Sequence, residues 1–220
     1  KQGYSHYMLK EIYEQPQAVA AAIEPHIDPQ DFSVSLKGVG FGGQSVQKLG
    51  ELDKAQDWQE TQKVFSRVER IFIIACGTSY YAGCVGKYLI EQLAKIPVEV
   101  DIASEFRYRN PVIPKNSLVL TISQSGETAD TLAAIRMAKD LGATTLSICN
   151  VKSSTIDREA HGHLYMNSGP EIGVASTKAF TSTLALLNCL SLALAKTRGS
   201  MSASEEAEHV KNLLAVPSQM

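Results

Sequence analysis

The chain has 220 residues, of which 44% are hydrophobic and 20% charged, as in an ordinary globular protein with one large domain. Its formal net charge is −2 and no run of Lys and Arg stands out, which argues against a nucleic-acid-binding surface. The four cysteines show no C-x-x-C pairing, so we expect reduced thiols rather than disulfides or a metal site.

The N-terminal part of the chain is predicted to be a helix followed by a loop. Residues 5–23 have helical character, and Pro16 should kink or divide that helix. Residues 24–58 contain two more prolines and the glycine cluster KGVGFGG, so we expect a loop with one short strand near 32–36. Residues 59–68 again have helical character.

From residue 69 onward the chain alternates regularly between apolar, β-branched runs and amphipathic stretches. The runs, which we predict to be strands, are 70–75, 98–103, 117–122, 144–149 and, more weakly, 163–167. Two helix faces are predicted between them: Ala82, Val85, Leu89 and Leu93, and then Leu132, Ile135, Ala138 and Leu141. Strands that alternate with helices in this way indicate βαβ units and a mostly parallel sheet.

The fold class is therefore predicted to be α/β, doubly wound, with helices on both faces of the sheet and an N-terminal helical extension. We divide the chain into an N-terminal helical and loop segment, 1–58, and the main domain, 59–220. Two further helices are expected at 177–197 and 202–215. The most apolar segment, 180–195, is too short and too mixed to span a bilayer and is predicted to be a buried core helix.

Three loops that precede predicted helices share a composition. They are CGTSYYAG at 76–83, SQSGETADT at 123–131 and GPEIGVASTKAF at 169–180. Each offers Ser or Thr beside Gly where a helix begins, and such a site can bind phosphate oxygens through hydroxyl and backbone N–H groups. The alternative is that these hydroxyls are ordinary helix N-caps. The loops match neither G-x-x-x-x-G-K-[ST] nor G-x-G-x-x-G, and no Mg²⁺ ligand set stands out.

Taken in this order, the three motifs resemble the sugar isomerase (SIS) domain of the glutamine:fructose-6-phosphate amidotransferase family. HYMLKEIYEQP at 6–16 is similar to the segment that opens the isomerase half of that family. The resemblance covers nearly the whole chain and is weakest at 38–56. It implies a flavodoxin-like three-layer sandwich that binds fructose 6-phosphate and glucosamine 6-phosphate.

The resemblance also implies which residues form the site. The phosphate would be held by Ser123, Gln124, Ser125 and Thr128. Thr78 and Ser79 would bind from the first loop, and Val174, through its backbone, and Ser176 would contact the sugar. No catalytic residue, cofactor or metal ion is expected in this chain, because the family's acid–base residues belong to the second SIS domain and the tail.

The same resemblance implies partners and a location. The partners would be the second SIS domain and the glutaminase domain of the parent enzyme, whose nucleophile is an N-terminal cysteine, whereas this chain begins with Lys1–Gln2. We expect a cytoplasmic homodimer without nucleic-acid or membrane partners. Two alternatives stay open: a non-catalytic sugar-phosphate-sensing module, and a sugar-phosphate isomerase complete in one domain, which would need a Glu or His base.

Five other side chains are candidates for functional groups. Glu127 is predicted to complement a helix dipole rather than to act as a base. The histidines of HGH, His161 and His163, are predicted to lie on the surface of an edge strand rather than to bind a metal. Cys76 is expected to be a small buried residue, and for Lys178 a phosphate contact and a surface position stay open.

Overall fold

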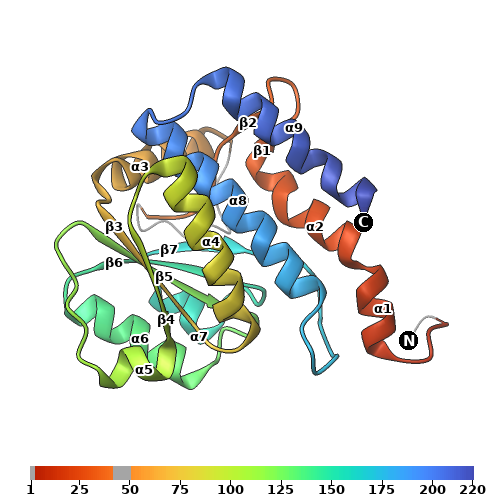
Figure 1. The fold of residues 1–220 in the computed structure, drawn as a ribbon, viewed down its shortest axis with the longest axis horizontal. Helices are drawn as coiled ribbons and strands as arrows, with labels where there is room; N and C mark the ends of the chain where they lie inside the picture. The colour runs from red at the N-terminus through yellow and green to blue at the C-terminus, as the bar shows by residue number, and fades with distance from the viewer. Residues whose placement is uncertain (1–2, 42–50) are drawn as a thin grey trace.

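A five-stranded parallel sheet forms the centre of the protein (Figure 1). The computed structural model describes residues 3–41 and 51–220, and of 51–53 the backbone alone. The strands are β3 (Arg70–Ala75), β4 (Val98–Ile102), β5 (Ser117–Ser123), β6 (Thr144–Cys149) and β7 (Gly162–Tyr165). Their spatial order, β4-β3-β5-β6-β7, is the order 2-1-3-4-5 of flavodoxin-like sheets. The predicted fold class is confirmed.

Both faces of the sheet are buried at its inner strand β3, which explains why that strand is almost continuously apolar. In β3, Ile71 and Ile73 belong to the larger hydrophobic core on one face. Phe72 and Ile74, between them, belong to a second core on the other face. Successive side chains of a strand point to opposite faces, so a run without polar positions predicts a sheet that is covered twice.

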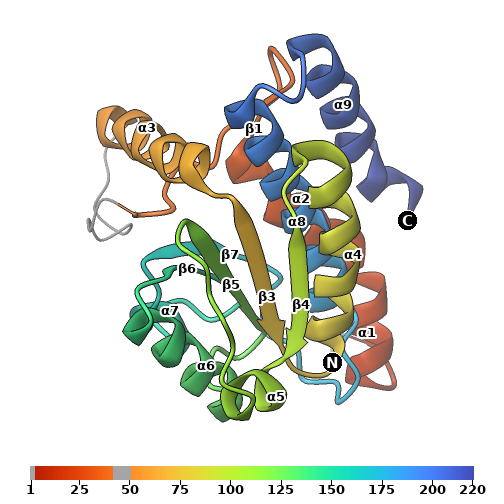
Figure 2. The same cartoon turned by 60° about the vertical axis from the view of Figure 1, so that its left-hand side comes forward.

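Helices form the two outer layers of the sandwich (Figures 1 and 2). One layer consists of α2 (Gln15–Ile23), α4 (Thr78–Ala94), α8 (Lys178–Arg198) and α9 (Ala203–Gln219). The other layer consists of α5 (Ala103–Tyr108), α6 (Ala129–Asp140) and α7 (Thr155–Glu159). The sequence pattern did not predict α5 and α7, which are too short to show a helical period.

Helix α8 is the central helix of its layer and contacts α2, α3, α4 and α9. Within the described part of the chain it is the one helix long and apolar enough to cross a membrane. However, 78% of its apolar window is buried inside the fold. The prediction of a buried core helix is confirmed.

The buried face of α4 differs from the predicted one. Val85 is exposed, whereas Ala82 and Gly86 face the core. A Cβ atom on Gly86 would lie 3.0 Å from both methyl carbons of Leu187, so this glycine lets α4 and α8 pack closely. Glycines do not contribute to an apolar pattern, so the predicted buried face of α4 is wrong at Val85. Leu141 was also placed on a buried face, but it follows the last turn of α6 and is exposed.

The N-terminal helix is divided as predicted. α1 (Tyr7–Tyr13) ends at Glu14, and α2 begins at Gln15 with Pro16 in its first turn. Proline is tolerated there because the first N–H groups of a helix have no partner within it. A 3-10 turn, Glu24–His26, follows α2.

The segment predicted to be a loop contains more structure than expected. β1 (Ile27–Asp28) and β2 (Ser33–Val34) form an antiparallel pair, so the strand near 32–36 is confirmed. The glycine cluster extends into 42–50, which lie outside the described residues. α3 (Glu51–Arg67) begins eight residues earlier than the helix predicted at 59, because its polar first turns carry little apolar periodicity.

The N-terminal segment shares the main core. Val19, Ile23 and Val34 belong to the same hydrophobic cluster as the inward face of β3. The boundary at 58 falls within α3. The division of the chain at that residue stays a prediction.

Candidate functional site

The point of the sheet at which a ligand is expected lies at the ends of β3 and β5. These two strands are neighbours, with Ala75 paired to Ile122, but β3 leads into α4 on one face and β5 into α6 on the other. In doubly wound sheets such a switch point, at the carboxyl ends of the strands, is where ligands bind. Two of the three predicted loops begin at this point.

The loop between β5 and α6 makes hydrogen bonds to the hydroxyl group of its own first residue, Ser123. The hydroxyl oxygens of Ser123 and Thr128 lie 3.0 Å apart, and the N–H of Gly126 donates to Oγ of Ser123 over 3.0 Å. Oγ of Ser125 accepts a hydrogen bond from the N–H of Glu127 over 3.2 Å. Three hydroxyl groups and two backbone N–H groups are thus gathered within six residues.

The backbone conformation and close packing of this loop require a glycine at position 126. Gly126 has a φ of 69°, in the left-handed region, and a Cβ atom there would lie 1.9 Å from Oγ of Ser154. Any side chain at this position would clash with Ser154, and glycine therefore allows the loop to pass close to the start of α7.

The hydroxyl groups at these helix starts do not act as N-caps. Thr128 occupies the N-cap position of α6, but its side chain makes no capping hydrogen bond and contacts Ser123 instead. The N-cap position of α4 is Gly77, which has no side chain to cap with. Two helices of 17 and 12 residues therefore direct N-termini without side-chain caps, and the partial positive charge of those ends, to one edge of the sheet.

The third loop, which leads into α8, is held by side chains that the sequence analysis did not single out. The carboxylate of Glu171 accepts hydrogen bonds from the N–H groups of Thr177 (2.8 Å) and Ala179 (3.1 Å) and from the hydroxyl of Ser176 (3.1 Å). It therefore caps α8 in place of Thr177, whose side chain makes no capping bond.

A second side chain, Asn150 after β6, holds the beginning of the same loop. Its Oδ1 accepts from the N–H and the hydroxyl of Ser168 over 3.0 and 2.9 Å, and its Nδ2 donates to the carbonyl of Gly169 over 2.7 Å. The N–H of Asn150 also donates to the carbonyl of Gln124 over 3.2 Å. Asn150 thus links the second and third loops.

Four of the eight predicted site residues meet around one small cavity: Thr78, Ser79, Gln124 and Ser176. Its volume is about 10 Å³, which is room for about one water molecule. The cavity is thus too small to hold a hexose phosphate. Val174 is fully exposed at the tip of the third loop.

Glu127 has a structural role in this arrangement. Its Oε1 accepts a hydrogen bond from the N–H of Thr155 over 2.8 Å, and this bond holds the pKa of the carboxyl below its usual value. The carboxylate thus lies at the start of α7. The prediction that it complements a helix dipole applies to that helix rather than to α6.

The remaining candidates are accounted for by local contacts. Nδ1 of His161 accepts from the N–H of Thr145 over 3.1 Å, and Nδ1 of His163 lies 3.0 Å from Oδ1 of Asp157. Within residues 3–41 and 54–220, no group of three His, Cys, Asp or Glu side chains is placed to hold a metal ion. Lys178 is not a surface residue, because it is 4% exposed and its Nζ lies 2.7 Å from Oε2 of Glu14.

Two of the four cysteines, Cys149 and Cys189, are buried, whereas Cys76, which was expected to be buried, is only partly so. All four are free thiols. Burial raises the pKa of Cys149 and of Cys189 to about 12, so neither is a thiolate at neutral pH. Cys76, at the end of β3, is half-buried and accepts a weak contact from the hydroxyl of Thr131 at 3.9 Å.

Comparison with known proteins agrees with this geometry. Residues 64–193, which include β3 to β7 and the three loops, match the SIS domain family. The chain belongs to the SIS domain family. Its sequence is 46% identical over 218 residues to the glutamine–fructose-6-phosphate aminotransferase [isomerizing] of Clostridium acetobutylicum. It is 47% identical over 215 residues to the enzyme of the same name from Bordetella parapertussis. These matches cover 99% and 97% of the chain but 32% of each relative, so the chain spans about a third of their length.

A solved structure narrows the match to one part of those enzymes. The SIS domain superposes on the C-terminal domain of glucosamine-fructose-6-phosphate aminotransferase from Francisella tularensis with a TM-score of 0.86 and 41% identity. The match covers 99% of this chain and 55% of that one. The chain therefore corresponds to about half of that C-terminal domain, and the family expected from its motifs is confirmed.

Proposed function

We propose that this chain is the sugar-phosphate-binding part of an enzyme that makes glucosamine 6-phosphate and glutamate from fructose 6-phosphate and glutamine. The names of its relatives support this activity, and the geometry supports the binding role. The observation that carries it is the pair of N-termini without side-chain caps, those of α4 and α6, which meet beside hydroxyl-rich loops at the switch point between β3 and β5.

Each predicted site residue has a role in this proposal. The hydroxyls of Ser123, Ser125 and Thr128 and the amide of Gln124 hold the phosphate, with Thr78 and Ser79 binding from the start of α4. The backbone of Val174 and the hydroxyl of Ser176 contact the sugar. A phosphate dianion suits this set, because hydrogen bonds to a charged acceptor are roughly twice as strong as those between neutral groups.

The rest of the parent enzyme would supply what this chain does not. We propose that residues 59–220 form the SIS domain and 1–58 lead into it, with a second SIS domain and a glutaminase domain as partners. The assembly would be a cytoplasmic homodimer that needs no cofactor. Isomerisation requires a positioned base, which in this proposal comes from the second SIS domain.

Calorimetric titration of this chain tests the binding role directly. Fructose 6-phosphate and glucosamine 6-phosphate should bind, inorganic phosphate should bind more weakly, and fructose should not bind measurably. The purified chain should make no glucosamine 6-phosphate from fructose 6-phosphate with glutamine or ammonia. Equal affinity for fructose and fructose 6-phosphate would contradict the phosphate site, and measurable synthesis would contradict the division of labour.

A further inference from the structure

A glutamate of the N-terminal helix α1 is buried beneath the loop that leads into α8. Glu11 is 2% exposed, and its Oε1 accepts a hydrogen bond from the N–H of Ile172 over 2.5 Å. The N–H of Gly173 lies 2.9 Å from Oε2 and 3.2 Å from Oε1 of the same carboxylate. Burial of a carboxylate costs free energy unless hydrogen bonds compensate it. Here the compensation comes from two consecutive backbone groups of one loop.

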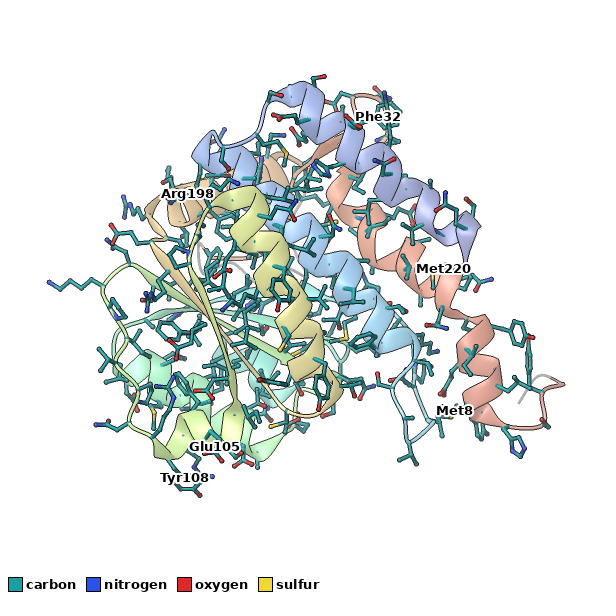
Figure 3. The ribbon with its side chains drawn as sticks, in the orientation of Figure 1. Met8, Phe32, Glu105, Tyr108, Arg198 and Met220 are labelled. Carbon is teal, nitrogen blue, oxygen red and sulfur yellow. The ribbon has the colours of Figure 1, made fainter. Side chains whose placement is uncertain are left out.

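The glycine that receives this carboxylate leaves it just enough room. A Cβ atom at Gly173 would lie 2.6 Å from Oε2 of Glu11 and 3.5 Å from Cα of Met8. Figure 3 shows Met8 on α1, close to the loop before α8. Any larger residue at position 173 would push the loop away from α1. Glu11 and Gly173 are therefore matched across 162 positions of sequence.

Helix α1 is itself fixed to the start of α8. The carboxylate of Glu14 lies 2.7 Å from Nζ of the buried Lys178 and 2.9 Å from Nζ of Lys10. These two lysines hold the pKa of Glu14 below its usual value, Lys178 having the larger effect. The helix that carries Glu11 is therefore held in place by ion pairs.

The loop is held at three places, and Glu11 holds its middle. Asn150 binds its beginning at Ser168 and Gly169, and Glu171 binds its end at the start of α8. The segment between these two anchors contains Val174, a proposed sugar contact, and leads to Ser176, which Glu171 also binds. Loss of Glu11 would release this middle segment and leave both ends bound.

We propose that Glu11 is a positioning residue that holds loop 169–177 in the form that receives the sugar part of a hexose 6-phosphate. This inference rests on the proposed function, since it names a determinant of the same site. The phosphate contacts lie in another loop, 123–128, which Glu11 does not touch. Glu11 of α1 thus affects the affinity for the sugar part of the ligand and leaves the affinity for its phosphate group unchanged.

The size of the effect follows from the population of the ordered loop. Apparent affinity falls in proportion to the fraction of molecules in the binding-competent form. If that fraction drops to about a tenth without Glu11, affinity for fructose 6-phosphate drops about tenfold. In this proposal inorganic phosphate is held by the loops at 76–79 and 123–128, so its affinity should stay the same.

The test compares two ligands in four variants. Glu11→Ala and Glu11→Gln remove the carboxylate, and Gly173→Ala crowds it without changing any residue of α1. Glu60→Gln, an exposed glutamate of α3 whose carboxylate pairs with Lys63, is the control. Calorimetry with fructose 6-phosphate and with inorganic phosphate is combined with amide hydrogen exchange at Ile172 and Gly173.

We expect the Glu11 and Gly173 variants to lose about tenfold in affinity for fructose 6-phosphate, with unchanged phosphate affinity and faster exchange at both amides. The control should match the unchanged chain. A parallel loss of both ligands, or no loss of either, would overturn the positioning role. If the Glu11 variants do not fold, Gly173→Ala alone decides. If the unchanged chain binds phosphate and fructose 6-phosphate equally, the proposed sugar site fails first, and this outcome is visible without any variant.

Discussion

The carboxylate of Glu171 and the backbone N–H of Thr177 lie 2.8 Å apart, and this hydrogen bond caps the longest helix among the described residues. The same carboxylate also accepts from the N–H of Ala179 and from the hydroxyl of Ser176. A capping carboxylate satisfies N–H groups that have no partner within the helix and faces the positive end of its dipole. One side chain therefore joins the stability of α8 to the position of a proposed sugar contact.

Glu171→Ala should lower the free energy of unfolding by about 1–2 kcal/mol, the usual cost of a lost helix cap. Urea denaturation measures the change, and Glu171→Gln, which keeps one acceptor oxygen, should lose less. Glu60→Ala, which breaks an exposed ion pair on α3, should stay within about 0.5 kcal/mol of the unchanged chain. A Glu171→Ala variant as stable as this control would show that the cap contributes nothing.

Ser125→Ala should weaken the binding of fructose 6-phosphate by roughly ten- to a hundredfold. A charge-assisted hydrogen bond contributes about 1.5–3 kcal/mol, and about 1.4 kcal/mol corresponds to a factor of ten. In the structure the Ser125 hydroxyl accepts a bond from the N–H of Glu127, so the alternative is a role in the turn alone. Calorimetry on the variant measures the affinity, and a thermal melt without ligand measures the stability.

The two roles of Ser125 give opposite results. A turn residue would lower the melting temperature and leave affinity nearly intact, and that result would exclude the hydroxyl from the phosphate site. Ser66→Ala is the matched control, because the hydroxyl of Ser66 on α3 also makes a single local hydrogen bond, to the carbonyl of Lys63. It should leave the affinity unchanged.

The parts of this structure that the sequence predicted are those whose physical cause is local. β3 is visible at 70–75 because burial on both faces requires an unbroken apolar run. Pro16 marks the division between α1 and α2, because its ring is excluded from a helix interior. The start of α3 was missed because its first turns are polar and make no apolar stripe.

The proposed site shows the same distinction. Hydroxyl-rich loops at 76–79 and 123–128 are visible in the sequence, since both follow predicted strands. Glu171 lies six residues before Thr177, so a search for capping carboxylates could have found it. Glu11 lies 161 residues from Ile172, and no local pattern marks a carboxylate that binds backbone so far along the chain.

Helix α4 supports the prediction of a homodimer. Tyr81, Val85 and Tyr88 are exposed and fall on one stripe of the helix, at spacings of four and three residues. Exposed apolar stripes commonly mark interaction surfaces. We expect light scattering to show a dimer at high micromolar concentration, and Tyr88→Glu to shift it toward monomer. Tyr108→Glu, an equally exposed change in the opposite helical layer, should leave the association unchanged.

A monomer at every concentration would contradict this prediction. So would a dimer that Tyr108→Glu dissociates and Tyr88→Glu does not, because the interface would then lie on the layer of α5 to α7.

The stability of the protein should fall in mild acid because of His26. This side chain is 6% exposed, and among the described residues none forms a hydrogen bond with its Nδ1 atom. Burial lowers the pKa of His26 from 6.5 to about 4. The folded form therefore takes up a proton less readily than the unfolded form, so stability is fully present above pH 6.5 and decreases as the pH falls toward 4. Between about pH 7.5 and pH 5 the expected loss is about 2 kcal/mol.

Urea denaturation at both pH values measures this loss of stability for the unchanged chain and for His26→Gln, which cannot titrate in this range. His209→Gln, which replaces an exposed histidine of α9, is the control and should keep the full pH dependence. If His26→Gln and the unchanged chain lose the same stability in acid, the histidine is not the cause.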